Sequence, residues 1–152
     1  MKRQMVKGLM MLTLIATVAL GTAVLSASGQ STLNVKAQIP FEFVVGDQTL
    51  PAGEYSVTAA GNSVRALMIQ NAEASISTFR LTNTIVPKRN KTEARLVFHR
   101  YGQNYFLREV WEGGETTGQE LRESKQERAI KREMDAVARN SYELVEIVAT
   151  LQ

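Results

Sequence analysis

The fold follows from the stretch Ile39-Pro40-Phe41-Glu42-Phe43-Val44-Val45-Gly46-Asp47-Gln48-Thr49-Leu50-Pro51-Ala52-Gly53-Glu54-Tyr55. Its first part alternates, because Phe41, Phe43 and Val45 fall on one face of an extended chain while Glu42 and Val44 fall on the other. This pattern predicts a half-buried strand. Pro40 lacks a backbone donor, which places the strand at a sheet edge or puts a break at its first residue.

Two turns follow within the same stretch. Gly46-Asp47 has the composition of a tight turn. In Leu50-Pro51-Ala52-Gly53, the proline can pre-set φ and the glycine can take a positive φ. The stretch therefore predicts a strand, a corner and the start of a second strand.

The residues after Tyr55 predict further strands joined by short turns. Residues 60–63 form a hairpin turn and residues 64–69 the returning strand. A helix over 64–74 is an alternative, but the turns on both sides are too close for a helix of normal length. A strand at 75–81 and a polar loop at 82–93 come next. The basic residues of that loop fit either a solvated connection or a contact with acidic polysaccharide or lipid headgroups.

The strongest predicted hairpin joins residues 94–101 to residues 105–111 through Gly102-Gln103-Asn104. A turn of two or of three residues would give opposite facial pairings, and both remain open. In the first strand, alternation places Leu96 and Phe98 on one face and Val97, His99 and Tyr101 on the other. In the second strand, it places Phe106 and Val110 on one face and Tyr105, Leu107, Glu109 and Trp111 on the other. This hairpin is expected to be the centre of the core.

The C-terminal part predicts one helix at about 119–139, because charged residues of opposite sign recur at a spacing of four and a narrow apolar stripe lies near its end. Residues 142–149 alternate well enough for a final strand, with continuation of the helix as the alternative.

Several of these segments resemble a family of small exported bacterial proteins of unknown function. The resemblance lies in Ile39-Pro40-Phe41-Glu42-Phe43, Gly46, Leu50-Pro51-Ala52-Gly53-Glu54-Tyr55, Leu96-Val97-Phe98-His99-Arg100-Tyr101-Gly102 and Tyr105-Phe106-Leu107, followed by a Glu- and Arg-rich helix from about Gln119. It implies a β-rich fold and export, and no activity. Residues 50–57 are also similar to a turn-and-strand phrase of transthyretin-like and carboxypeptidase-regulatory-like β-sandwiches.

The N-terminus has the layout of a secretory signal peptide. Lys2, Arg3 and Lys7 precede an uncharged run, residues 8–25, and the small residues 26–29 follow. Cleavage after Ser28 would leave residues 29–152 as a single domain. The run is long enough for an uncleaved membrane anchor to be the alternative, and it would be the chain's sole contact with a membrane.

Composition excludes several kinds of site. The chain has no cysteine, hence no disulfide, thiolate metal site or lipid-modified cysteine. Without its first 28 residues the chain has as many basic as acidic residues, so its basic character is no argument for nucleic acid. The glycines at 113–118 are spaced as in a phosphate-binding loop, but Gln119 and Glu120 replace its lysine and hydroxyl residue, which argues against nucleotide binding.

Few residues could carry chemistry. His99 is the only histidine, so neither a metal centre nor a serine nucleophile with its base is expected. Glu109 and Glu112 could form a pair of catalytic carboxylates. A platform for sugars could be made of strand aromatics, because flat aromatic faces complement the apolar faces of sugars; the candidate binding residues are Tyr101, Tyr105 and Trp111.

The sequence thus predicts a mainly β protein: an antiparallel β-sandwich or small open barrel of about seven strands with one C-terminal helix. The expected function is a non-enzymatic structural or interaction module of the bacterial cell envelope or extracellular space. No cofactor or metal is expected, and the expected partner is an envelope protein or a polysaccharide. Carbohydrate binding is the alternative from a second functional class, and a small carboxylate-dependent hydrolase is a third.

Overall fold

The structure, a computed structural model, describes residues 33–61, 63–87, 92–136 and 142–151. Contacts divide the chain into Met1–Gln30 and Ser31–Gln152, and the fold below is that of the second unit, which contains its own core. The predicted signal peptide and the basic residues of the 82–93 loop lie outside the described residues.

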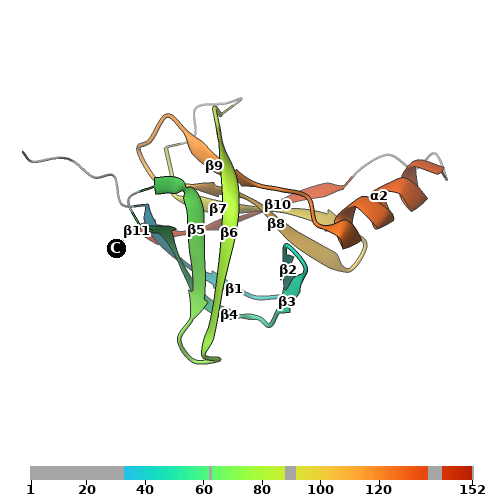
Figure 1. Cartoon of the computed structure of the whole chain (residues 1–152), viewed down its shortest axis with the longest axis horizontal. Coiled ribbons are helices and arrows are strands. Elements are labelled where there is room, and N and C mark those ends of the chain that lie inside the picture. Colours follow the sequence, from blue (N-terminus) through green and yellow to red (C-terminus); the bar gives the residue numbers. More distant parts are fainter. Residues whose placement is uncertain (1–32, 62, 88–91, 137–141, 152) are drawn as a thin grey trace, which may run out of the picture. The chain divides into compact units, whose positions relative to one another are not determined.

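The described part of the chain is mainly β with one helix (Figure 1), which confirms the predicted class. Eleven strands are present in the described residues, more than the predicted seven or so, because β2, β3, β9 and β11 are only two to four residues long. The strands are β1 Asn34–Ile39, β2 Phe43–Val45, β3 Gln48–Leu50, β4 Gly53–Ala60, β5 Ser63–Asn71, β6 Ile76–Ile85, β7 Arg95–Tyr101, β8 Asn104–Trp111, β9 Gly118–Leu121, β10 Glu143–Val148 and β11 Thr150–Leu151, and the helix is α2, Lys125–Ala136.

The strands follow the order β10-β7-β8-β9-β6-β5-β4-β1-β11, which is not closed into a barrel. β6 divides this order into two sheets, since its first part pairs with β5 and its last part with β9. The first sheet is β11-β1-β4-β5-β6 and the second is β6-β9-β8-β7-β10. They are sandwich-like, because β1 of the first sheet contacts β7 and β10 of the second, and β5 and β6 cross β7 and β8 in Figure 1.

The stretch at 39–55 contains both predicted turns, but its first strand begins at Phe43 and not at Phe41, and a short strand, β3, lies between the turns. β2 and β3 form a hairpin whose two-residue turn is Gly46-Asp47, with Gly46 at a φ of 63°. Phe43 and Val45 are buried in the main core, while Val44 faces the other side of the strand. β2 pairs in parallel with β8 through Val44 and Phe106, so it belongs to the second sheet.

The core lies between the inner faces of the two sheets. Tyr55 is fully buried, and Phe43 packs edge-on against Tyr55 and Phe98, with ring centroids 5.0 and 5.5 Å away. Further buried members are Val35, Val57, Leu67 and Ile69 from the first sheet and Leu96, Leu107 and Val110 from the second. Burial of this apolar area is the main stabilising contribution of the fold.

The β7–β8 hairpin has the predicted extent, and its turn is the two-residue Gly102-Gln103. The facial assignment of β7 is confirmed, but that of β8 is wrong. A β-bulge leaves Arg108 without a partner on β7, since Phe98 pairs with Leu107 and Val97 pairs with Glu109. The extra residue puts Leu107 and Val110 together in the core. Phe106, Arg108 and Trp111 face outward instead, on the side opposite Leu107.

The predicted start of the polar loop and the predicted start of the helix are both wrong, because the two segments pair with each other. The polar loop was expected from residue 82 and the helix from residue 119, but Thr82–Ile85 and Gly118–Leu121 form paired strands, the end of β6 and β9. Leu121 is buried in the core, and Thr82 donates a buried hydrogen bond to Gln119 of 3.0 Å. Pairing across a distance of more than thirty residues outweighs the helical propensity of the segment.

The helix is therefore shorter than predicted at its start. α2 begins after Ser124, whose Oγ accepts the backbone N–H of Glu127 at 2.9 Å. It ends at Ala136 in the described residues, and residues 137–141 lie outside them. The strand predicted at residues 142–149 is confirmed by β10, which pairs with β7 from Glu143 to Val148.

Candidate functional site

The candidate site is an open groove on the outer face of the second sheet. It has a volume of about 620 Å³. Its floor comes from β7 and β8, one wall from β10, and the other from β9 and the segment that follows β6. The lining residues are Ile85, Val86, Pro87, Arg95, Val97, His99, Glu109, Trp111, Glu120, Tyr142, Leu144 and Glu146. The groove combines apolar walls with several ionisable groups.

Trp111 lies at one end of the floor, opposite Arg95. Its ring is almost entirely buried, and it lies so close to Gly118 that a Cβ there would meet it at 2.6 Å. The indole Nε1 donates to Glu109 Oε2 at 2.7 Å, and the guanidinium of Arg95 lies 4.8 Å from the ring centroid. These contacts hold the indole, the carboxylate and the guanidinium in fixed positions on the groove floor.

Two carboxylates lie next to one another in the groove. Glu109 of β8 and Glu120 of β9 are direct partners across the two strands. Like charges at such positions destabilise a sheet. Arg108 reduces the repulsion between the two carboxylates, because its Nη2 forms a 2.9 Å ion pair with Glu120.

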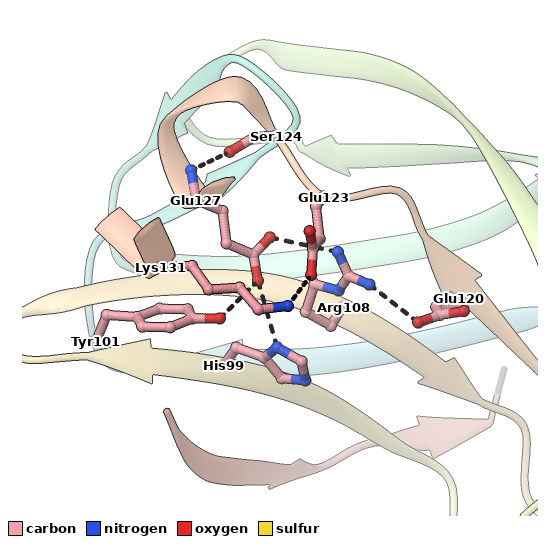
Figure 2. A network of polar contacts seen from close by, with 8 residues as sticks. All are labelled: His99, Tyr101, Arg108, Glu120, Glu123, Ser124, Glu127 and Lys131. Carbon is pink, nitrogen blue, oxygen red and sulfur yellow. Dashed lines mark hydrogen bonds and ion pairs between the residues drawn. The ribbon is translucent and has the colours of Figure 1, made fainter. Parts of the chain in front are cut away.

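A cluster of buried polar side chains lies where α2 meets β7 and β8 (Figure 2). Glu127, in the first turn of α2, is 1 % exposed and points toward the sheet. Its carboxylate accepts from Tyr101 Oη at 3.4 Å and from Arg108 Nη1 at 3.3 Å. His99 Nδ1 lies 3.3 Å from the same carboxylate without a well-formed hydrogen bond to it. Arg108 therefore joins the buried cluster to Glu120 in the groove.

Electrostatic effects follow from this burial. Burial raises the pKa of Tyr101 far above its usual value, and the negative charges of Glu127 and Glu123 raise it further. At the outer side of the cluster, a 3.1 Å hydrogen bond from Lys131 lowers the pKa of Glu123, and the same bond raises the pKa of Lys131. Tyr101 is thus a neutral hydrogen-bond donor in the folded protein.

The structure separates the three predicted binding residues. Tyr101 is buried beneath α2 as part of the cluster, and Trp111 is buried in the groove floor. Tyr105 faces the opposite side of β8, where it stacks on Phe41 at 3.9 Å and packs against the core. The bulge at Arg108 puts Tyr105 and Trp111 on opposite faces, so these aromatics form no common platform.

The other residues singled out in the sequence are also dispersed. Glu109 lines the groove but Glu112 does not, so the expected carboxylate pair is not assembled there. His99 lines the groove between the Glu127 carboxylate and the ring of Tyr142, on which it stacks at 3.8 Å. Its Nδ1 therefore faces the buried cluster.

Sequence reasoning missed Arg108, Glu120 and Glu127. One signal for Glu127 was present, because Ser124 and Glu127 have the spacing of a capping box, which marks the start of a helix. In the structure the Ser124 half of this motif forms, whereas the Glu127 carboxylate binds the sheet instead. No pattern in the sequence predicts the bulge that turns the Arg108 side chain outward.

Within the described residues, no three His, Asp or Glu side chains are arranged to hold a metal ion. Nor does that part of the chain contain a helix that is both long and apolar enough to cross a membrane. No family model, no curated protein and no solved structure matches this chain.

Proposed function

We propose that this chain is an exported interaction module, without an enzymatic activity of its own, that holds a segment of an envelope or extracellular protein in its outer groove. The observation that carries the proposal is the groove itself, an open cavity of about 620 Å³ lined by apolar side chains and by three carboxylates. Export is supported by the N-terminal sequence and by the resemblance of residues 39–55 and 96–107 to small exported bacterial proteins.

The apolar contribution to binding comes from side chains at the two sides of the groove. Val86, which follows β6, is 76 % exposed, and Leu144 of β10 is also exposed. Large apolar side chains that flank a groove favour a partner that covers them. A bound segment with one or two apolar side chains would remove both from water.

The charges of the groove select a basic segment. Glu109, Glu120 and Glu146 line it together with Arg95, and Arg108 forms an ion pair with Glu120. Since Glu109 and Glu120 are direct cross-strand partners, a lysine or arginine side chain placed between them would reduce their repulsion. The favoured partner therefore has a cationic residue beside its apolar ones.

Arg95 is part of the groove floor. It is 7 % exposed, and its guanidinium lies 4.8 Å from the ring centroid of Trp111. A side chain held in this way helps to shape the groove. No observation favours sugar binding by Tyr101, Tyr105 and Trp111.

The test uses two peptide libraries, one with a fixed lysine or arginine between apolar residues and one with a fixed glutamate in its place. Binding is followed through the fluorescence of Trp111, the only tryptophan of the chain. We expect basic peptides to bind with a saturable shift and acidic ones to fail. Glu109→Gln and Leu144→Ser should each weaken binding by about tenfold.

Matched controls lie outside the groove. Leu151→Ser removes an apolar side chain of similar exposure, and Glu115→Gln removes an exposed carboxylate, so both should bind as the parent does. The proposal fails if neither library binds, if control and groove variants lose affinity equally, or if envelope polysaccharides and not peptides shift Trp111.

A further inference from the structure

A second surface, distinct from the groove, lies where β6 approaches the start of α2. It surrounds a depression of about 380 Å³ that shares no lining residue with the groove. The residues that line it are Gly46, Asp47, Phe79, Arg80, Leu81, Leu121, Arg122, Glu123, Ser124, Lys125 and Arg128. We call it the β6–α2 surface.

Large apolar side chains project from this surface. Phe79 is 60 % exposed and Leu81 is 68 % exposed, both on the outer face of β6. Their partners across the ladder to β5 are Met68 and Ala66, so an apolar strip continues on the outer face of the first sheet. Single exposed apolar residues are ordinary, but adjacent large ones indicate an interaction site.

Basic side chains line the same depression as Phe79 and Leu81. Arg122, Lys125 and Arg128 are exposed, and none has a side-chain partner within the part of the chain that the structure describes. Arg80 also lines the depression, but it lies on the face of β6 opposite Phe79 and Leu81, where its Nε and Nη2 donate to Val45 O at 3.1 and 2.8 Å. The carboxylates that line the surface are Asp47 and Glu123, and Glu123 already pairs with Lys131.

We propose that the β6–α2 surface docks on the anionic surface of a lipid bilayer. Phe79 and Leu81 enter the boundary between headgroups and acyl chains, and the unpaired cations contact phosphate headgroups. A soluble acidic polymer would satisfy the cations but would leave both apolar side chains in water. The combination of the two therefore favours a membrane over a polysaccharide or a nucleic acid.

The basic side chains of α2 fit this arrangement. The helix packs on the hairpin through Ile130 and Met134, and Glu127 lies buried on the same side. At a helical repeat of 3.6 residues, Lys125 and Arg128 fall on the side away from this contact, together with the exposed Arg132. This side also carries the exposed Asp135, but basic residues outnumber it three to one, so it can face a membrane while the helix remains docked on its own sheet.

The experiment is co-sedimentation of residues 29–152 with vesicles. This form is used because the uncharged N-terminal run would itself bind lipid, and because the core lies within Ser31–Gln152. Vesicles of equal parts phosphatidylglycerol and phosphatidylcholine should bind the protein, and phosphatidylcholine alone should not. Binding should fall as salt is raised, because salt screens exposed charges.

Matched variants separate the apolar contribution to vesicle binding from the electrostatic one. Phe79→Ser and Leu81→Ser should each weaken binding by about tenfold, and Val86→Ser, in the groove, should not. Lys125→Gln combined with Arg128→Gln should weaken it by about twentyfold. The double variant Lys36→Gln with Arg100→Gln removes the same charge elsewhere and should have little effect.

Three results would overturn the proposal. The first is equal binding to vesicles with and without phosphatidylglycerol. The second is equal loss of binding in the surface variants and their controls. The third is binding to a soluble anionic polysaccharide that does not depend on Phe79 and Leu81, which would make the surface a polyanion site. The peptide experiment on the groove is independent of all three.

Discussion

A single inserted residue in β8 organises the candidate site. Because Arg108 has no partner on β7, its side chain leaves the inner face, and Leu107 and Val110 take core positions on either side of it. Arg108 then reaches Glu120 and Glu127 at 2.9 and 3.3 Å. A bulge re-aims a side chain in this way at many functional sites. Here the bulge places Arg108 where it links the groove to α2.

Tyr101 makes the stability of the protein sensitive to alkali. Its pKa is raised in the folded state, mainly by burial, whereas the unfolded chain has the ordinary value of 10.0. The resulting stabilisation is complete below pH 10 and is lost as the pH rises further, since only the unfolded chain then releases the proton. We expect the free energy of unfolding to fall by up to about 1.4 kcal/mol per pH unit above that point.

The measurement is urea unfolding of the parent and of Tyr101→Phe from neutral pH to about pH 11. The variant should be less stable by about 1 kcal/mol at neutral pH, because it lacks the hydrogen bond to Glu127. It should lose less stability above pH 10 than the parent. Tyr142→Phe, at an exposed tyrosine, serves as the control. Equal alkaline slopes in the parent and Tyr101→Phe would contradict the assignment.

At the scale of elements, α2 is held by few interactions for a helix of 12 residues. Ile130 and Met134 pack against Val44, Tyr101 and Phe106, and Glu127 binds the sheet through its carboxylate. Its N-terminal cap therefore contributes a large share of what orders its first turn.

Removal of the cap should be measurable. Ser124→Ala deletes the acceptor of the 2.9 Å bond from the Glu127 backbone, and we expect a loss of about 1 kcal/mol in the free energy of unfolding. Ser124→Asp supplies a carboxylate acceptor and should retain most of the stability. Thermal or urea unfolding checks both. Ser77→Ala, at an exposed strand position, controls for the loss of a hydroxyl, and a cost as large as that of Ser124→Ala would refute the capping role.

At the scale of the whole domain, two segments connect the sheets. β6 pairs with β5 in the first sheet and with β9 in the second. At the C-terminus, β10 pairs with β7 and β11 with β1, and Ala149 between them is buried and donates to Ala94 O at 2.8 Å. Neither sheet can separate without disrupting the other, so the domain should unfold in one cooperative step.

A substitution at Ala149, between β10 of the second sheet and β11 of the first, tests whether the domain unfolds cooperatively. Ala149→Glu places an unpaired charge in the core and should destabilise both sheets together, by on the order of 3 kcal/mol. Trp111 fluorescence reports on the second sheet and far-ultraviolet circular dichroism on all strands, and their unfolding curves should shift together. Thr150→Glu, at the exposed neighbour, should be nearly neutral. Separate transitions for the two signals would contradict cooperative unfolding.

The mainly β class, the corner at residues 39–55, the two strands at 94–111 and the strand at 142–149 were predictable from the sequence. Each depends on alternation within one segment or on a turn residue such as Gly46, and such signals are local. Candidate residues could be chosen by type, as Tyr101, Tyr105, Trp111 and Glu109 show. Their grouping could not be predicted, because it requires the register of strands.

The sequence by itself therefore determined which segments extend, where the chain turns and which side chains are available for burial. Only the tertiary structure decided that residues 118–121 join a sheet and that Arg108 turns outward. It also decided that Glu127 binds the sheet through its carboxylate and that Tyr105 lies on the face opposite Trp111. The physical reason is that pairing and packing energies come from residues far apart in the chain, and a shift of one residue moves every later side chain to the opposite face.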